Sequence, residues 1–240
     1  MNTGRTINNL VDYFGIINEK QEKQFTKRVV RVLYRGQSDA DLLLPSIARV
    51  NATKDTSVIE TNMLEYVKRV AYMKIESKTD LELLITAQHY GLKTRLLDWS
   101  SNPLVALYFA IEKEYQMLRN SFVYILEVPQ TMIWELNENE IKNVKPFEIS
   151  DTKILRPTLN NERVVAQSGW FTIHKSKNGF QPLEQDPNIT NNITQLIIPA
   201  NQKRLLLKQL NDYGINARTL FPDFNGACFH ANWKFHDELI

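Results

Sequence analysis

The chain has 240 residues, of which 43% are hydrophobic and 23% charged, so it can bury a proper core and wholesale disorder is excluded. Lysine and arginine number 29 against 27 aspartates and glutamates, for a net charge of +2, which argues against nucleic-acid binding driven by charge over the whole surface. Cys228 is the single cysteine, which excludes an internal disulfide and a multi-cysteine metal site.

Targeting signals are not apparent in the sequence. The first residues contain no apolar core of the secretory type, and no run approaches the ~18 apolar residues that a membrane-crossing helix needs. Together with the near absence of cysteine, these features predict a cytoplasmic protein with no membrane partner.

Hydrophobic periodicity and β-branched runs divide the chain into helices and strands. The first helix has apolar residues at helical spacing on one face and charge on the other. The expected elements, in chain order, are a helix over 6–28, a strand over 29–34, helices over 57–72 and 81–89, a strand at 96–97, a helix over 103–115, strands over 122–128, 164–167, 170–173 and 194–198, a helix over 203–213 and a last short segment after 219–223.

Capping chemistry bounds several of these elements. Thr79 or Asp80 is suited to the N-cap of the helix over 81–89, and Gly91 to its C-terminal stop. Residues 100–102 precede Pro103, which is the usual order of an N-cap followed by a proline in the first helical turn.

Strands and helices follow each other without regular βαβ units, which favours an α+β fold over a doubly wound sheet. No internal repeat or low-complexity block marks a second unit. We therefore expect a single domain over 1–240, with a helical segment at 1–28 and an α+β core at 29–240 whose mixed or antiparallel sheet is flanked by helices.

The first candidate site is Tyr34-Arg35-Gly36-Gln37, at the end of the expected strand. An arginine beside glycine at a strand end lies where the backbone opens, and its planar fork can hold a phosphate or carboxylate by two contacts. The structural alternative is an arginine that pairs with an acidic residue.

The second candidate is the loop-rich stretch 87–103, which gathers His, Tyr, Thr, Arg, Asp, Trp, Ser and Asn between two apolar helices. Loops on a rigid scaffold are where binding groups concentrate. The structural alternative is a cluster of capping residues in which Arg95 and Asp98 form a buried pair and His89 is a satisfied structural side chain.

The third candidate lies within 160–171. Glu162 opens a β-branched stretch that is expected to be a strand, and Gln167 lies further along it. One of the two could hydrogen-bond a ribose hydroxyl. The alternative is a surface glutamate and a glutamine in a turn.

Signatures of several common enzyme classes are missing. The sequence has no Walker loop, G-x-G-x-x-G, HExxH, G-x-S-x-G or CxxC motif. The histidines at 89, 174, 230 and 236 lack metal-ligand spacing. A kinase, a Rossmann dehydrogenase, a zinc hydrolase and an α/β-hydrolase are therefore disfavoured, and no metal site is expected.

These motifs resemble the FRG-domain family, named for its aromatic-Arg-Gly motif, which is Tyr34-Arg35-Gly36 here. The central stretch 87–99 is the most specific part of the resemblance, which extends over most of the chain. Other segments similar to the family are Leu44-Pro45-Ser46-Ile47-Ala48-Arg49, residues 102–110, Arg163-x-x-Ala166-Gln167-x-Gly169-x-Phe171 and Leu220-Phe221-Pro222-Asp223.

The chain is more distantly similar to ADP-ribosyltransferases that carry an aromatic-Arg-Gly motif on an early strand. In these enzymes a Ser/Thr-rich strand end and a V-A-x-x-F-A helix follow, and a glutamate on a later strand completes the site. Here, 99–101, the helix start at 105–110 and Glu162 are similar to those elements, although there is no clean Ser-Thr-Ser or Glu-x-Glu. Glu162 and Gln167 compete for the last role.

This resemblance implies an ADP-ribosyltransferase-like sheet and NAD as co-substrate. It implies that Arg35 holds phosphate, Glu162 stabilises the oxocarbenium-like sugar and His89 takes a proton from the acceptor. Serine at 100 or 101 would bond a ribose hydroxyl, and the aromatic ring at 90 or 99 would stack on nicotinamide. The implied NAD-binding residues are Tyr34, Arg35, Gly36, Gln37, Tyr90, Thr94, Trp99, Ser100, Ser101, Asn102 and Gln167.

Three functions stay open from the sequence. The first is an ADP-ribosyltransferase that modifies protein or nucleic acid, as a toxin or anti-phage effector with a possible antitoxin partner. The second is a non-catalytic module that binds a nucleotide or a partner protein in the same pocket. The third is a nuclease- or hydrolase-like enzyme that uses His89 and Asp98 without NAD.

Overall fold

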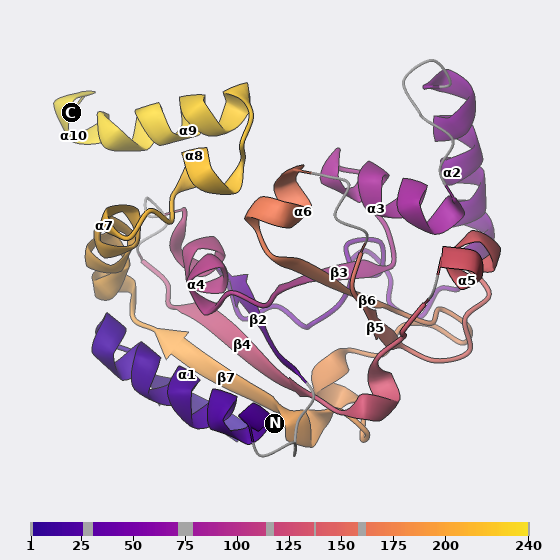
Figure 1. The fold of residues 1–240 in the computed structure, drawn as a ribbon, viewed down its shortest axis with the longest axis horizontal. Helices are drawn as coiled ribbons and strands as arrows, with labels where there is room; N and C mark the ends of the chain where they lie inside the picture. The colour runs from indigo at the N-terminus through magenta and orange to yellow at the C-terminus, as the bar shows by residue number, and fades with distance from the viewer. Residues whose placement is uncertain are drawn as a thin grey trace.

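The computed structural model describes residues 2–25, 31–71, 79–113, 118–136, 138–157 and 162–239. Within them the chain forms one mixed sheet of seven strands flanked by helices, which confirms the expected α+β class (Figure 1). The strand order is β1-β7-β4-β2-β3-β6-β5. The strands are β1 Asn2–Thr6, β2 Arg31–Gln37, β3 Leu96–Ser100, β4 Ser121–Val128, β5 Lys153–Leu155, β6 Gly169–Ile173 and β7 Ile193–Ile198.

Most of the expected helices are present, and the second half of the chain contains short helices that were not expected. The helices expected over 57–72, 81–89, 103–115 and 203–213 are present, but the third ends at Ile111, so residues 112 and 113 are not helical as expected. Residues 72, 114 and 115 lie outside the described part. The helices are α1 Leu10–Phe25, α2 Ser57–Val70, α3 Asp80–His89, α4 Pro103–Ile111, α5 Glu138–Asn143, α6 Glu162–Ala166, α7 Lys203–Asp212, α8 Ala217–Leu220, α9 Phe224–Lys234 and α10 His236–Leu239.

The N-terminal segment corrects the helix expected over 6–28. Residues Asn2–Thr6 form β1, which pairs in parallel with β7, and α1 begins only at Leu10. The amide of Ile7 continues this pairing by donating to the carbonyl of Ile197 at 2.8 Å. Pairing of this kind satisfies backbone groups, which side-chain periodicity does not report. Residues 26–28 of the expected helix lie outside the described residues.

The segment 164–167, expected to be a strand, is instead part of the short helix α6. Val164 is buried against the backbone at Gly169, whereas Val165 points to solvent. Ser168 follows the helix with a φ of 49°, which ends it and turns the chain into β6. The preference of valine for strands is weak and depends on packing, and here the tertiary contacts decide.

The two faces of the sheet carry separate buried clusters because side chains alternate along each strand. Val123 and Ile125 of β4 join α1, α4 and α7 in one cluster, and Tyr124 and Leu126 enter a second cluster on the opposite face. A third cluster packs α2 and α3 on β3, β6 and β5. Figure 1 shows α1 lying along β7 and β4 at one side, with α2 and α3 at the other.

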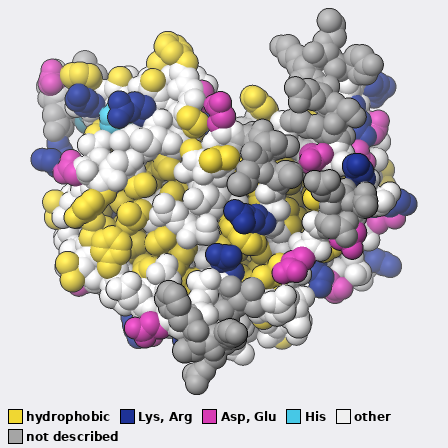
Figure 2. Space-filling view, viewed as in Figure 1, with side chains coloured by type: hydrophobic (Ala, Val, Ile, Leu, Met, Phe, Trp, Pro, Cys, Tyr) yellow, Lys and Arg dark blue, Asp and Glu magenta, His cyan; other side chains and the backbone are white. Residues whose placement is uncertain are grey.

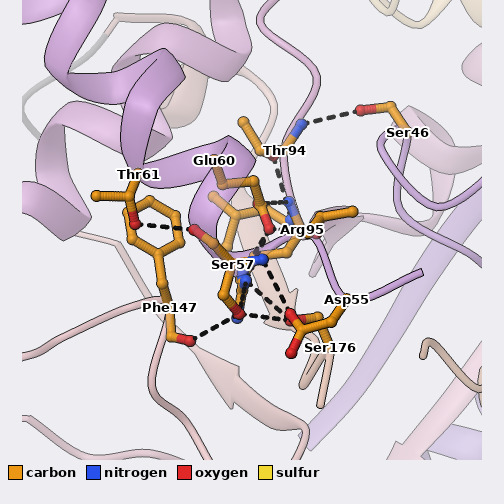
Figure 3. A network of polar contacts seen from close by, with 11 residues as sticks. Ser46, Asp55, Ser57, Glu60, Thr61, Thr94, Arg95, Phe147 and Ser176 are labelled. Atoms are coloured by element: carbon orange, nitrogen blue, oxygen red, sulfur yellow. Dashed lines mark hydrogen bonds and ion pairs between the residues drawn. The ribbon is translucent and has the colours of Figure 1, made fainter. Parts of the chain in front are cut away.

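A buried polar network fixes the start of β3 (Figure 3). Arg95 is fully buried and donates from Nε and Nη2 to Oε2 of Glu60 in α2, at 3.0 and 2.7 Å. Nη2 also donates to the hydroxyl oxygens of Ser57 and Ser176, and the guanidinium lies 5.1 Å from the ring centre of Phe147. The network joins α2, β3 and the segment after β6.

This network shows that the buried Arg95–Asp98 pair considered from the sequence is wrong. Arg95 directly precedes β3, and its side chain is buried against Glu60 of α2. The side chain of Asp98, within β3, is 58% exposed. Asp98 is therefore not paired with Arg95, and its side chain lies at the surface that carries the candidate site.

Candidate functional site

A cavity of about 400 Å³ lies beside the strand end that carries the aromatic-Arg-Gly motif. Its volume falls in the range of about 300–1,000 Å³ that is usual for small-ligand sites. Its walls come from β2 and the loop after it, α3, β3, α4, α6 and the segment after α8. The lining residues are Tyr34, Arg35, Gly36, Gln37, Ser38, Asp39, Asp41, Arg49, Gln88, His89, Asp98, Trp99, Ser100, Val105, Ala106, Phe109, Glu112, Lys113, Arg163, Gln167 and Phe221.

Arg35 is held where β2 and β3 separate. The two strands share only the register pair Tyr34–Ser100. Next to this pair, Nη1 of Arg35 donates to the backbone carbonyl of Asp98 at 2.7 Å, and Nε donates to Oε1 of Gln37 at 3.1 Å. Gln37 is itself fixed because its Nε2 donates to the carbonyl of Asp41 at 2.8 Å. The guanidinium is therefore fixed in orientation before any ligand arrives.

The outer part of this guanidinium stays available. Among the described residues, Nη2 of Arg35 has no hydrogen-bond partner, and the Asp98 carboxylate lies 3.9 Å from Nη1. Burial lowers the pKa of Arg35 to about 10; Asp98 opposes this shift and Arg49 adds to it. The group stays protonated at pH 7, so its positive charge persists in a partly dry site.

Arg49 adds a second positive charge to the same wall. Its Nε donates to the carbonyl of Leu44 at 3.2 Å, and the side chain has no ion pair among the described residues. Two neighbouring guanidinium groups bind an anion more strongly than either does alone, because the anion also relieves their mutual repulsion. This wall therefore suits a phosphate or pyrophosphate group.

Asp98 is fixed from the opposite side by α3. Nε2 of Gln88 donates to its Oδ1 at 2.7 Å, and the Gln88 amide oxygen accepts from the hydroxyl of Thr94. The Thr94 hydroxyl also accepts from the amide of Leu96 at 3.1 Å. Thr94 is buried beneath the wall and does not line the cavity, so its role is to orient Gln88 and, through it, the carboxylate.

His89 ends α3 at the cavity wall. Its ring meets Phe171 edge-on with centroids 6.1 Å apart, and its buried Nε2 has no partner among the described residues. Burial lowers the pKa of His89; nearby Asp98 opposes this shift and Arg163 adds to it. The imidazole is therefore neutral at pH 7. The backbone carbonyl of His89 accepts a hydrogen bond from Nη1 of Arg163 at 3.3 Å.

The far wall is made by α6 and the turn between α8 and α9. Arg163 pairs with Asp223 through Nε and Nη2, and its guanidinium lies 5.5 Å from the ring centre of Phe221. Asp223 caps α9 by accepting from the amide of Gly226 at 2.9 Å. Nε2 of Gln167 donates to the carbonyl of Leu220 at 3.1 Å. These contacts attach the C-terminal helices to the cavity.

Several predicted binding residues line the cavity but are already used structurally. Trp99 is 3% exposed and donates from its indole nitrogen to the hydroxyl of Thr172 at 3.2 Å. The hydroxyl of Ser100 donates to the carbonyl of Gln167 at 2.7 Å and accepts from the amide of Asn102 at 3.0 Å. Tyr34 is 1% exposed, and its hydroxyl accepts from Gln21 at 3.3 Å.

The predicted residues thus divide into two groups. The cavity brings together Tyr34, Arg35, Gly36, Gln37, His89, Trp99, Ser100 and Gln167. Outside it lie Glu162, Tyr90, Thr94, Ser101 and Asn102.

The residues outside the cavity have other places in the fold. Glu162 is exposed at the start of α6, and Tyr90 is 85% exposed at the end of α3. Asn102 caps α4 through the amide of Leu104 at 2.9 Å, and Ser101 bonds the carbonyl of Ser168. The N-cap expected within 100–102 is therefore confirmed at Asn102.

The cavity also includes residues outside the predicted set of NAD-binding and catalytic residues, among which Asp98 was considered only for the hydrolase-like alternative. The most notable are Asp98, Gln88, Arg49, Arg163, Glu112 and Phe221. All of these except Glu112 lie in the segments that are similar to the FRG family. Their place in those motifs is the feature of the sequence that could have identified them as site residues. Glu112 follows the last residue of α4 and belongs to no motif.

The described residues contain neither a candidate metal cluster nor a helix suited to cross a membrane. No group of three or more histidine, cysteine, aspartate or glutamate side chains there could hold a metal ion. None of the helices in the described ranges combines the length and hydropathy of a membrane span.

Comparison with known proteins gives one match. No curated protein and no solved structure is similar enough to the chain to be matched. Residues 30–118 match the family model of the FRG domain. This range contains β2, α2, α3, β3 and α4, and so the part of the cavity that carries Arg35 and Asp98. Over this part of the chain, the match supports the resemblance to the FRG-domain family that the Tyr34-Arg35-Gly36 motif indicates.

Proposed function

We propose that the chain is an NAD-dependent ADP-ribosyltransferase-like enzyme that modifies protein or nucleic acid. The supporting observation is the oriented guanidinium of Arg35, which lines a cavity of ligand size together with Arg49 and whose Nη2 has no hydrogen-bond partner among the described residues. A forked cation held on two sides suits a pyrophosphate, because both its charge and its direction are set in advance.

A carboxylate is needed near the sugar, because breaking the nicotinamide–ribose bond builds positive charge there. Glu162 lies outside the cavity, whereas Asp98 lines it and is oriented by Gln88 at 2.7 Å. We assign this electrostatic role to Asp98. Gln167 lines the same cavity and is the remaining polar candidate for a ribose hydroxyl.

A labelling experiment tests the proposal. Purified protein is incubated with NAD⁺ labelled in the adenylate part and with cell extract, as wild type, Arg35→Ala, Asp98→Asn and Glu162→Gln. Arg69→Ala, an exposed change on α2, is the control. We expect transfer by wild type, the control and Glu162→Gln, and its loss in the other two variants.

Affinity for NAD⁺, measured by calorimetry, separates binding from chemistry. Hydrogen bonds to charged groups contribute about 1.5–3 kcal/mol, so Arg35→Ala is expected to bind roughly 10–100-fold more weakly. Asp98→Asn keeps the shape of the side chain and is expected to bind NAD⁺ about as well as wild type. If wild type binds no NAD⁺ and releases no nicotinamide, the proposal is wrong.

The second candidate is a non-catalytic module that binds a nucleotide in the same cavity. It is favoured by the exposed position of Glu162 and by the structural use of the Ser100 hydroxyl. This candidate predicts NAD⁺ or nucleotide binding that depends on Arg35, without release of nicotinamide by any variant.

A further inference from the structure

A second cavity of about 520 Å³ adjoins the first. It lies among α4, α7, α8 and α9, and Glu112, Lys113 and Phe221 line both cavities. Figure 1 shows α8 and α9 placed above α4 and α7 on the same side of the molecule. In Figure 2, that side also carries many of the hydrophobic side chains visible in this view.

The two cavities differ in chemistry. The first contains the guanidinium groups that suit a pyrophosphate, whereas aromatic and aliphatic side chains such as Tyr108, Leu207 and Trp233 line the second. Asn211 and Asn232 add neutral polar groups. An anionic substrate would therefore suit the first cavity, and a second, less charged reactant would suit the second. The residues that line both cavities would then lie between the two reactants.

Glu112 is the carboxylate in that common wall. It directly follows α4, and its backbone amide donates to the carbonyl of Tyr108 at 2.8 Å. Its side chain is partly buried and has no hydrogen bond or ion pair among the described residues. An acidic side chain at a helix C-terminus faces the negative end of the helix dipole, so its proton is held more tightly than in water.

The same helix connects Glu112 to Arg35. Ala106 and Ala110 of α4 lie directly against Gly36, the residue after Arg35. At a rise of 1.5 Å per residue, Glu112 is roughly 9 Å further along the helix axis than Ala106. Asn102 caps the first turn, so the position of Glu112 relative to the motif is set by a short, rigid element.

We propose that Glu112 is the general base of the transfer reaction and that the acceptor enters through the second cavity. This assignment rests on the proposed function. The bond between C1′ of the ribose and nicotinamide N1 breaks, and its electron pair stays on nicotinamide. A lone pair of the acceptor forms the new bond to C1′, and the acceptor's proton moves to the Glu112 carboxylate. The products are nicotinamide, the ADP-ribosylated acceptor and protonated Glu112, which returns its proton to water.

The protonation behaviour of this carboxyl agrees with such a role. Burial raises the pKa of Glu112 to about 7, and neighbouring Lys113 opposes the shift. A base whose pKa lies near the working pH is deprotonated in a large fraction of the molecules and still binds a proton strongly enough to take it from the acceptor. The other charged or titratable groups that line the two cavities are Tyr34, Arg35, Asp39, Asp41, Arg49, His89, Asp98, Tyr108, Arg163, His230 and His236.

The test compares Glu112→Gln with Glu22→Gln, the same change at an exposed position of α1, and with His89→Asn. Each full-length protein is assayed for NAD⁺ affinity and for transfer of label to acceptors in cell extract from pH 5.5 to 8.5. We expect Glu112→Gln to bind NAD⁺ within about twofold of wild type and to transfer label at least about 100-fold more slowly, the usual minimum effect of an acid–base group. The rise in rate around pH 7 should be lost in Glu112→Gln alone.

A second readout needs no substrate. The side-chain carboxyl of Glu112, followed by carbon NMR, is expected to titrate near pH 7, and its signal is assigned by its absence in Glu112→Gln. A signal that titrates near pH 4.5, or a Glu112→Gln variant with wild-type rate and pH profile, overturns the assignment. So does loss of the rise in rate in His89→Asn. If wild type binds NAD⁺ but neither transfers label nor releases nicotinamide, the proposed function fails first and the role of Glu112 falls with it.

Discussion

At the scale of single residues, Gly36 shows why the aromatic-Arg-Gly motif contains glycine. A Cβ at this position would lie 2.0 Å from the carbonyl oxygen of Ala106 and 2.5 Å from the amide nitrogen of Ala110. The backbone of α4 therefore rests on β2, and no larger residue fits without separating them. Arg35 supplies the charge, and the glycine lets the helix that carries Glu112 pack beside it.

We expect Gly36→Ala to destabilise the protein by about 3 kcal/mol, the upper part of the usual range for overpacking, because the added methyl group meets rigid backbone. Gly15→Ala is the matched control. A Cβ at Gly15 meets nothing within 4 Å in the exposed face of α1, and alanine in a helix should add about 1 kcal/mol of stability. Urea unfolding measures both changes. Equal effects of the two substitutions would show that α4 does not pack on β2 in this way.

At the scale of secondary-structure elements, the Glu60–Arg95 pair links α2 to β3 and so supports the strand that carries Asp98. Both side chains are buried, and the amide of Arg95 also donates to Oε1 of Glu60 at 2.9 Å. Removing one partner of a buried ion pair leaves the other charge without compensation. The stability of this link therefore depends on both residues together.

We expect Glu60→Gln to lower the free energy of unfolding by about 3–5 kcal/mol. Glu65→Gln on the exposed side of the same helix removes one of the two acidic partners of Lys68, the other being Asp80, and exposed pairs contribute only about 0–1 kcal/mol. Denaturant unfolding of both variants at pH 7 gives the comparison. If Glu60→Gln is no less stable than Glu65→Gln, the buried pair does not hold α2 on β3.

The same elements show what the sequence could predict. The helices around 81–89 and 103–111 and the strands around 122–128 and 194–198 follow from periodicity and capping, because those signals are local. The parallel pairing of β1, the helix at Glu162 and the partner of Arg95 depend on contacts between distant segments. Of the residues that line the cavity, Arg35 was marked in advance by the aromatic-Arg-Gly motif, whereas Glu112 belongs to no motif and only the fold brings it there.

At the scale of the whole molecule, the cavity is completed by segments far apart in sequence. Its Arg35 wall lies within the FRG match at 30–118, but Arg163, Gln167 and Phe221 come from beyond it. Because the Arg163–Asp223 pair attaches α9 to this wall, the C-terminal helices belong to the functional unit.

Global stability should also depend on one buried histidine. His174 is 1% exposed; its Nε2 shares a hydrogen bond of 3.1 Å with the hydroxyl of Thr172, and its Nδ1 has no partner among the described residues. Burial lowers the pKa of His174 to about 3, and the positive charges of Arg35 and Arg95 add to this shift. The folded protein therefore keeps this imidazole neutral at pH values where the unfolded chain protonates it.

The sign of the pH effect follows from proton binding. Below the unfolded pKa of about 6.5, His174 binds one more proton in the unfolded state than in the folded state. The free energy of unfolding therefore falls as the pH is lowered, by about 1.4 kcal/mol per pH unit. This fall ends where the folded pKa of about 3 is reached. His174→Gln keeps a polar end group for Thr172 but cannot titrate. We expect the free energy of unfolding of wild type, relative to this variant, to fall by about 2 kcal/mol between pH 6 and pH 4.5. Subtracting the two urea-unfolding curves cancels the contributions of Glu112 and the other carboxyl groups, which are present in both proteins. A difference that stays constant over this range would mean that His174 is protonated as readily in the folded protein as in the unfolded chain. Burial and the positive charges of Arg35 and Arg95 would then not lower the pKa of this imidazole.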